Sequence, residues 1–283
     1  MTAKAPDLNE TESIFASQAV AERWHRAKSR RAAGSGPANE RMLELANIRA
    51  GDRVLDVAAG TGDQTILAAQ RVGPTGSVVA VDLSPHMLKI ADEAIRNAGV
   101  TNVETRLMNA EEIDFDTDSF DMVICRMGLM VFPDPVKALM GMHRVVKQGR
   151  KVVALVPSTE EKNPCRGIPL GVVRRIGSNL TEVPGLRSLF SLGKPDALQE
   201  TFRASGFTDV ASHTVPTRAI FSSAAEAVRI TMDSFPGLRH LMDQLSEAER
   251  EQAWTEIEHQ LSEFEGPNGF EAPGEVLIGV GIK

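Results

Sequence analysis

The sequence predicts an α/β fold, with a doubly wound and mostly parallel sheet of seven strands and helical insertions that form a lid. Between residues 52 and 157, short apolar segments typical of strands alternate with amphipathic segments typical of helices. Residues 120–127 and 150–157 are apolar without alternation, as strands covered on both faces are. Such an order implies parallel strands with helices on both faces of the sheet.

The central elements follow one another with short connections. Pro85 at the start of one helical segment and Gly99 at its end are typical helix boundaries. We expect strands at residues 52–59, 77–83, 102–110, 120–127 and 150–157, and helices at 63–72, 85–99 and 134–146. We assign residues 49–157 to a nucleotide-binding core.

Residues 1–12 are polar, and we interpret them as a disordered leader. Residues 13–48 are expected to form lid helices with one apolar face, on which Ala16, Val20, Trp24 and Ala27 recur at helical spacing. Glycine and proline in residues 30–39 predict a break and a flexible link to the sheet.

After Pro157 the pattern changes, and we expect residues 158–283 to combine pocket-building insertions with the last elements of the sheet. The insertions are predicted at 158–194 and 218–272. Ser246, followed by Glu249, predicts the start of a long helix. The remaining elements are expected as a helix at 194–207 and strands at 208–217 and 275–283.

The composition is that of an ordinary globular protein, with 42% apolar and 24% charged residues. A net charge of −7 argues against a general nucleic-acid binder. Cys125 and Cys165 are too few for a disulfide framework or a four-cysteine zinc site, and no histidine has metal-ligand spacing. No segment reaches the ~20 apolar residues of a membrane span. We therefore expect a cytoplasmic protein without a metal.

The segment "VLDVAAGTGD", residues 54–63, places an acid in a strand and glycines directly after it. A glycine turn between strand and helix lets a ligand approach the backbone, at the edge of the sheet where doubly wound folds bind ligands. Asp56 disfavours a phosphate there and favours a cationic or zwitterionic ligand. Gly60 and Gly62 are therefore predicted to serve a ligand rather than the core.

The next two strands also end in polar residues. Asp82 lies twenty residues after Gly62, where a carboxylate can accept hydrogen bonds from both ribose hydroxyls. Asn109 and Glu111 follow the third strand. Together these strand ends predict a site for a nucleoside with a positively charged tail.

Two other nucleotide sites match less well. A dinucleotide fingerprint would need a third glycine at Thr65, and a phosphate-binding P-loop would need a lysine followed by serine or threonine. A nicotinamide dehydrogenase is thus the weaker interpretation. A non-catalytic nucleoside-binding module that supports a partner enzyme is the alternative to a catalyst.

From residue 53 to about 156 the sequence resembles the class I S-adenosylmethionine-dependent methyltransferases. The segments that carry the resemblance are "VLDVAAGTGD", "VVAVDLSPHML", "MNAEEI" and "FDMVICRMGLMVFPDPVKALMGMHRVVKQGRKVV". It is most similar to the ubiquinone/menaquinone-biosynthesis C-methyltransferases. The resemblance implies a Rossmann-like fold, S-adenosylmethionine as cofactor and in-line methyl transfer to carbon, oxygen or nitrogen of a small molecule.

The resemblance also implies which residues bind the cofactor. Asp82 would hold the ribose, and Arg126 and Met127 would lie near the sulfonium. The implied cofactor residues are Asp56, Ala58, Gly60, Thr61, Gly62, Gln64, Asp82, Leu83, Met87, Asn109, Ala110, Glu111, Arg126 and Met127.

The acceptor side is less defined by sequence. Trp24 and His25 lie on a helix that in this family often covers the cofactor, which makes His25 a candidate base; both, with Met127, Met130 and Arg166, are candidate acceptor-pocket residues. Arg166 belongs to a group of insertion arginines suited to an acidic or phosphorylated acceptor, with Arg174, Arg175 and Arg187. The sequence departs from the family where residues 218–274 separate the last two strands, which in the family form a near-continuous hairpin. The sequence predicts neither the identity of the methyl acceptor nor the oligomeric state.

Overall fold

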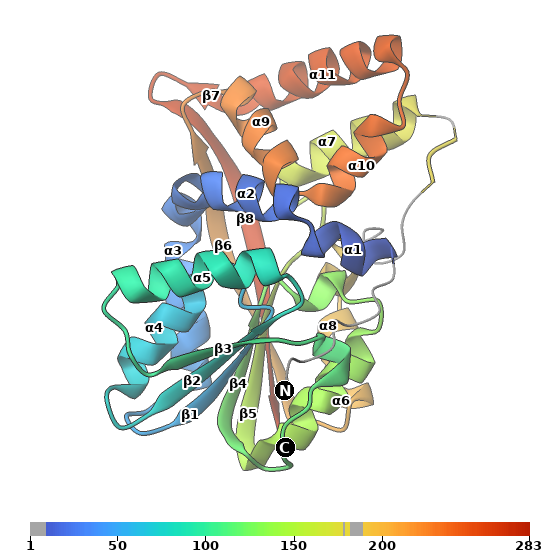
Figure 1. Cartoon of the computed structure of the whole chain (residues 1–283). Helices are drawn as coiled ribbons and strands as arrows, with labels where there is room; N and C mark the ends of the chain where they lie inside the picture. Colours follow the sequence, from blue (N-terminus) through green and yellow to red (C-terminus); the bar gives the residue numbers. More distant parts are fainter. Residues whose placement is uncertain (1–9, 178, 182–188) are drawn as a thin grey trace.

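The structure is a computed structural model that describes residues 10–177, 179–181 and 189–283 (Figure 1). Its centre is a twisted sheet with the strand order β3-β2-β1-β4-β5-β8-β6. The first five strands in this order are parallel, while β8 is antiparallel to both β5 and β6. The strands are β1 (Arg53–Val57), β2 (Ser77–Asp82), β3 (Val103–Leu107), β4 (Phe120–Arg126), β5 (Val146–Pro157), β6 (Thr208–Phe221) and β8 (Gly269–Ile282).

The predicted doubly wound α/β fold with seven strands is confirmed, apart from the two-residue strand β7 (Glu265–Gly266), which pairs with β8. Helices cover both faces of the sheet, and a buried apolar core lies on each side. The helices of this layer are α3 (Lys28–Ala46), α4 (Asp63–Val72), α5 (Pro85–Asn97), α6 (Pro135–Val145) and α8 (Ala197–Ala204).

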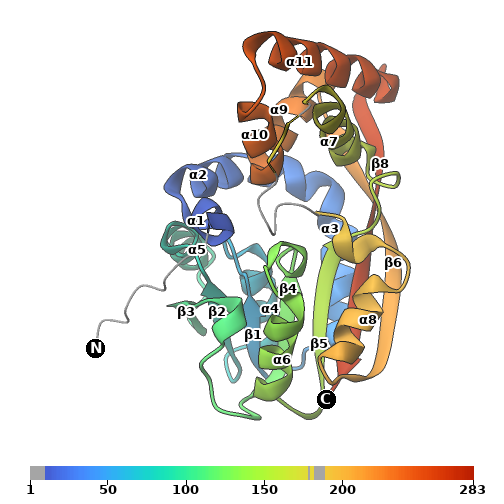
Figure 2. The same cartoon turned by 90° about the vertical axis from the view of Figure 1, so that its right-hand side faces the viewer.

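A long hairpin of β6 and β8 extends the sheet beyond the other strands. Pairing between β5 and β8 ends at Val276, whereas β6 and β8 remain paired as far as Phe221 and Phe270. This arm carries a helical cap above the sheet (Figures 1 and 2). The cap consists of α7 (Pro164–Ile176), α9 (Ala224–Ser234), α10 (Pro236–Asp243) and α11 (Glu247–Leu261).

The arm was only partly predicted, because its outer residues fall within the insertion expected at 218–272. The apolar residues of its sequence do not alternate with polar ones: the neighbours Ile220 and Phe221 are both apolar, although Ile220 is exposed and Phe221 is buried against the ring of Phe270. The predicted start of α11 is correct, since Ser246 and Glu249 form a reciprocal capping box.

The N-terminal segment forms α1 (Glu10–Ala16), α2 (Gln18–Arg26) and α3. Residues 1–9 of the predicted leader lie outside the described residues. Residues 10–12 belong to α1, so the disorder predicted for them is wrong. The predicted break and flexible link at residues 30–39 are wrong, because α3 runs unbroken through this segment. A Cβ added to Gly34 would lie 1.6 Å from the carbonyl oxygen of Arg218, so the glycine allows α3 to pack directly against β6.

Candidate active site

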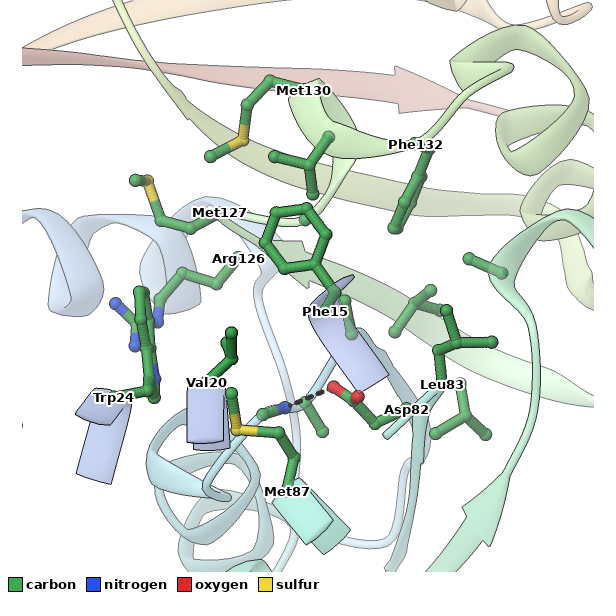
Figure 3. A pocket seen from close by; sticks show the side chains of 18 of the residues that line it. Phe15, Val20, Trp24, Asp82, Leu83, Met87, Arg126, Met127, Met130 and Phe132 are labelled. Carbon is green, nitrogen blue, oxygen red and sulfur yellow. Dashed lines mark hydrogen bonds between the residues drawn. The ribbon is translucent and has the colours of Figure 1, made fainter. Parts of the chain in front are cut away.

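A pocket of about 160 Å³ lies where β1, β2 and β4 end. The helices α1 and α2 border it on one side, and the cap residues Phe235 and Pro236 on another. Figure 3 shows Val20 and Trp24 on one side of the pocket, with Met130 and Phe132 opposite. Ligands of doubly wound sheets bind at this edge.

The glycine turn after β1 is built from unusual backbone conformations. Gly60 has φ +56° and Gly62 has φ +79°, and even Ala58 has φ +57°. The backbone N–H of Gly60 donates a 2.8 Å hydrogen bond to Asp82 Oδ2. The turn after β1 is thereby joined to the end of β2.

Asp82 accepts a second backbone hydrogen bond, of 2.9 Å, from the Ser84 N–H to Oδ1. Burial raises the pKa of this carboxyl, and hydrogen bonds from Ser84, Gly60 and Leu83 oppose that rise. Each carboxylate oxygen has about two lone pairs, so both can still accept a ligand hydroxyl. Asp82 also lines the pocket.

Asp56 and Gln64 supply oxygens that lack donors. Thr65 Oγ1 donates to Asp56 Oδ2 over 2.6 Å, but among the described residues the buried Asp56 Oδ1 and Gln64 Oε1 have no hydrogen-bond partner. Burial raises the pKa of Asp56 to about 7, although the Thr65 hydrogen bond and the charge of Arg126 lower it. Two buried acceptors without donors fit an ammonium group.

Arg126 lies at the end of β4 and lines the same pocket. Burial lowers the pKa of its guanidinium, while the charges of Asp63 and Asp56 raise it. Met127 follows with φ +59°, a conformation that turns the chain sharply away from the strand.

The structure brings most of the predicted cofactor residues to this pocket. Those that line it are Asp56, Ala58, Gly60, Gln64, Asp82, Leu83, Met87, Asn109, Ala110, Arg126 and Met127. Thr61, Gly62 and Glu111 do not line it. Gly62 instead packs against α5, where an added Cβ would lie 3.2 Å from the Ala91 side chain. Glu111 Oε1 accepts a 2.8 Å hydrogen bond from the Asp134 N–H, at the start of α6.

On the acceptor side, Trp24, Met127, Met130 and Arg166 line the pocket. His25 is exposed on α2 and is not among the described residues that border it. The other insertion arginines lie elsewhere: Arg174 pairs with Glu160 at 3.0 Å and Arg175 pairs with Glu256. Arg187 lies outside the described residues.

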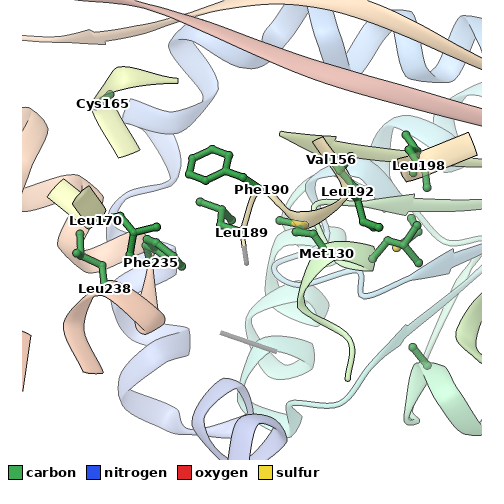
Figure 4. Close-up of a cluster of buried hydrophobic side chains, with 14 of the residues drawn as sticks. Met130, Val156, Cys165, Leu170, Leu189, Phe190, Leu192, Leu198, Phe235 and Leu238 are labelled. Carbon is green, nitrogen blue, oxygen red and sulfur yellow. The ribbon is translucent and has the colours of Figure 1, made fainter. Parts of the chain in front are cut away.

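Several pocket residues were not predicted. Phe15 from α1, Phe132, and the cap residues Ser234 and Phe235 all border the cavity. Only the fold brings the cap to the strand ends, so no local motif could have indicated Ser234 or Phe235. Figure 4 shows how the cap is anchored: Leu170, Phe235 and Leu238 belong to the same buried cluster as Met130 and Val156.

Neither a metal cluster nor a membrane span is visible in the described part of the chain. Its His, Cys, Asp and Glu side chains form no group of three that could hold a metal ion. No helix within residues 10–177, 179–181 and 189–283 is long and apolar enough to cross a bilayer.

Comparisons with solved structures support the fold. The chain superposes on the YcgJ protein from Bacillus subtilis with a TM-score of 0.58 and 20% identity, over 88% of this chain and 98% of that one. Phosphoethanolamine N-methyltransferase 2 from Haemonchus contortus, solved with S-adenosyl-L-methionine, gives 0.58 at 16% identity, over 98% of this chain and 60% of that one. At these identities the likeness concerns the fold alone.

Sequence comparisons identify the family. A model of the ubiE/COQ5 methyltransferase family matches residues 38–167. The demethylmenaquinone methyltransferase of Geobacillus stearothermophilus is 35% identical over 178 residues, which are 60% of this chain and 76% of that enzyme. The enzyme of that name from Bacillus subtilis is 36% identical over 122 residues, 43% of this chain and about half, 52%, of the relative.

These matches confirm the predicted family, the Rossmann-like methyltransferase fold and S-adenosylmethionine as cofactor. With a strand-end pocket that contains the glycine turn and Asp82, and with a relative matched over three quarters of its length, the chain belongs to the ubiE/COQ5 methyltransferase family.

Proposed function

We propose that the chain transfers a methyl group from S-adenosylmethionine to a small-molecule acceptor whose apolar body is held between the strand ends and the cap. One observation carries this proposal: two acids at neighbouring strand ends, Asp56 and Asp82, face an apolar pocket beside a glycine turn. Acids and a glycine turn fit a cationic nucleoside, and the apolar wall fits the body of an acceptor.

We assign the cofactor contacts from the chemistry of the side chains. Asp82 would accept the ribose hydroxyls, and Leu83 and Met87 would pack near the adenine. The methionine ammonium would meet Asp56 Oδ1 and Gln64 Oε1, the buried oxygens without donors. Arg126 would then neutralise the carboxylate of the same tail, close to the charges of Asp56 and Asp63.

We place the acceptor among Trp24, Met130 and the cap. Met127, Phe132 and Phe235 add apolar wall, and Arg166 adds a charge. Bound S-adenosylmethionine supplies an electrophilic methyl group on a sulfonium. The chain's contribution is to hold the attacking atom in line with that methyl and to exclude water.

No residue needs to act as a nucleophile in such a displacement, and a base is needed only where the acceptor must lose a proton. The exposed position of His25 gives no support to its predicted role as that base. We therefore attribute the rate mainly to positioning by Trp24, Met130 and the cap.

The relatives are named for demethylmenaquinone, which makes a quinone-like ring one candidate acceptor. The family match ends at residue 167, before α9, α10 and α11. Since α9 and α10 form part of the pocket wall, the acceptor of this chain can differ from that of the relatives. The cytoplasmic location stays a prediction from sequence.

The test uses purified full-length chain, methyl-labelled S-adenosylmethionine and a metabolite extract, with a demethylmenaquinone as a separate acceptor. We expect label in a small molecule with the wild type and a loss of that label with Asp82→Ala. Tight binding of S-adenosylhomocysteine without transfer to any fraction would favour the alternative, a nucleoside-binding module that supports a partner enzyme.

A further inference from the structure

A second chamber of about 110 Å³ adjoins the first pocket. The two share Trp24, Arg126, Met127, Arg166 and Ser234 as walls.

The chamber is positively charged within a chain of net charge −7. Three arginines line it, Arg126, Arg166 and Arg218, and no aspartate or glutamate is among the described residues of its wall. Arg218 is paired with Glu271, and Arg126 lies near the charges of Asp56 and Asp63. Arg166 is the arginine whose charge the described residues leave uncompensated.

Arg166 has no ion-pair or hydrogen-bond partner for its guanidinium among the described residues. Desolvation lowers its pKa, but a guanidinium stays charged in proteins. A desolvated charge without a partner is costly, and a bound anion would offset that cost.

Ser234 offers a second polar group to the same space. Its Oγ is buried and lacks a partner in the described part of the chain. Thr231 Oγ1 donates a 3.3 Å hydrogen bond to the Cys165 carbonyl, which fixes α9 against the start of α7. Arg166 follows Cys165, and Ser234 lies three residues after Thr231 on the same face of α9, so this contact brings both to the chamber wall.

We infer that the second chamber is an oxyanion subsite, in which Arg166 and Ser234 bind a carboxylate or phosphate group of the methyl acceptor. The inference rests on the proposed function and names its substrate class: a small molecule whose apolar body occupies the first pocket and whose anionic group occupies the second. A neutral quinone does not fit this class.

The experiment measures binding to the full chain saturated with S-adenosylhomocysteine, by calorimetry. The probes are benzoate and phenyl phosphate, with the neutral benzamide and benzyl alcohol as matched controls. Hydrogen bonds to charged groups correspond to about a tenfold or larger change in affinity. We expect one of the anionic probes to bind at least about tenfold more tightly than its neutral control, and the stronger of the two identifies carboxylate or phosphate.

Arg166→Met should remove this preference, Arg166→Lys should retain part of it, and Ser234→Ala should reduce it several-fold. Arg175→Met, on the same helix but paired with Glu256 at the surface, should leave it unchanged. If Arg166→Met does not fold, the wild-type preference and Ser234→Ala decide the question.

Equal binding of anionic and neutral probes would overturn the inference, as would a preference that survives Arg166→Met. The inference would also be overturned if Arg166→Met lost as much affinity for S-adenosylhomocysteine as for the anionic probe, because Arg166 would then hold the cofactor's carboxylate. Failure of the wild type to bind S-adenosylhomocysteine at all would instead contradict the proposed function.

Discussion

The Gly60 N–H and Asp82 Oδ2 are joined by a hydrogen bond of 2.8 Å. The bond fixes the turn after β1 to the acid at the end of β2. Because the chain itself holds these two groups together, less ordering entropy is lost when a ligand binds. Gly60 and Asp82 therefore form one structural unit of the site.

Replacing Asp82 with alanine should weaken binding of S-adenosylhomocysteine by about 1.5–3 kcal/mol, the range for hydrogen bonds to a charged group. The Gly60 and Ser84 N–H groups would also lose their acceptor, so we expect a lower melting temperature. Calorimetry and thermal melting on one sample separate the two effects. Asp116→Ala, at an exposed loop position, is the matched control and should change neither. Unchanged affinity in Asp82→Ala would remove Asp82 from the site.

Gly60→Ala should weaken cofactor binding more than it destabilises the fold. Gly60 has φ +56°, and Gly99, which follows α5 and does not line the pocket, has φ +68° with open space around it. Both changes place an alanine at positive φ, at a cost of about 1–2 kcal/mol. We expect similar melting temperatures for Gly60→Ala and Gly99→Ala, but impaired binding only in the former. Equal affinities would show that the turn does not contact the ligand.

Affinity for S-adenosylhomocysteine should rise with pH through about 7. Without ligand, the pKa of Asp56 is raised to about 7, so much of the carboxyl is protonated below that pH. A bound ammonium favours the carboxylate, and binding then releases a proton. By linkage, the dissociation constant should increase by up to about tenfold per pH unit below 7 and level off above it.

The same pKa shift gives a stability prediction with the opposite sign for the unliganded chain. The pKa of Asp56 is higher in the folded state than its ordinary unfolded value, so its stabilising contribution is present at low pH and is lost as pH rises towards about 7. Asp56→Asn should remove most of the pH dependence both of the affinity for S-adenosylhomocysteine and of the stability of the unliganded chain. A pH-independent affinity between pH 6 and 8 in the wild type would contradict an ammonium at Asp56.

Trp24 should report on cofactor binding directly. A Cβ at Gly60 would lie 3.9 Å from Trp24 Nε1, so the indole adjoins the glycine turn, whereas Trp254 is 37% exposed on α11. In Trp254→Phe, addition of S-adenosylhomocysteine should change the remaining tryptophan fluorescence. In Trp24→Phe it should not. A response in Trp24→Phe alone would place the ligand near α11 instead.

Removing residues 1–28 should leave a folded core with weak cofactor binding and little turnover. These residues include Phe15, Val20 and Trp24 of the pocket wall. Val20 also packs on Met87, so some stability will be lost as well. Full turnover in a folded truncation would contradict a role for α1 and α2 in closing the site.

The gathering of the proposed cofactor residues in one pocket could be predicted from sequence because it depends on local patterns. Asp56, Gly60 and Asp82 each follow from a strand, its end and the turn beyond it. The unbroken course of α3 could not be predicted, because a glycine is typical of a helix end and the reason for Gly34 is its contact with β6, which is distant in sequence. Propensity is a weak guide where tertiary packing requires a small residue.

The acceptor half depends on contacts between distant segments. Ser234 and Phe235 reach the pocket only because the β6–β8 arm carries α9 and α10 back over the strand ends. Arg166 was predicted by its charge, yet the second chamber around it joins α3, α7, α9 and β6, which no local spacing connects. His25, by contrast, follows Trp24 on α2 but lies on the exposed side of that helix.

A crystal structure of the chain with S-adenosylhomocysteine tests the proposed site most directly. The arrangement predicts ribose hydroxyls on Asp82, the amino group at Asp56 and Gln64, and the sulfur facing the space between Trp24, Met130 and Arg166. A ligand in this pocket whose sulfur faces away from Met130 and the cap, or a ligand bound elsewhere on the chain, would contradict it.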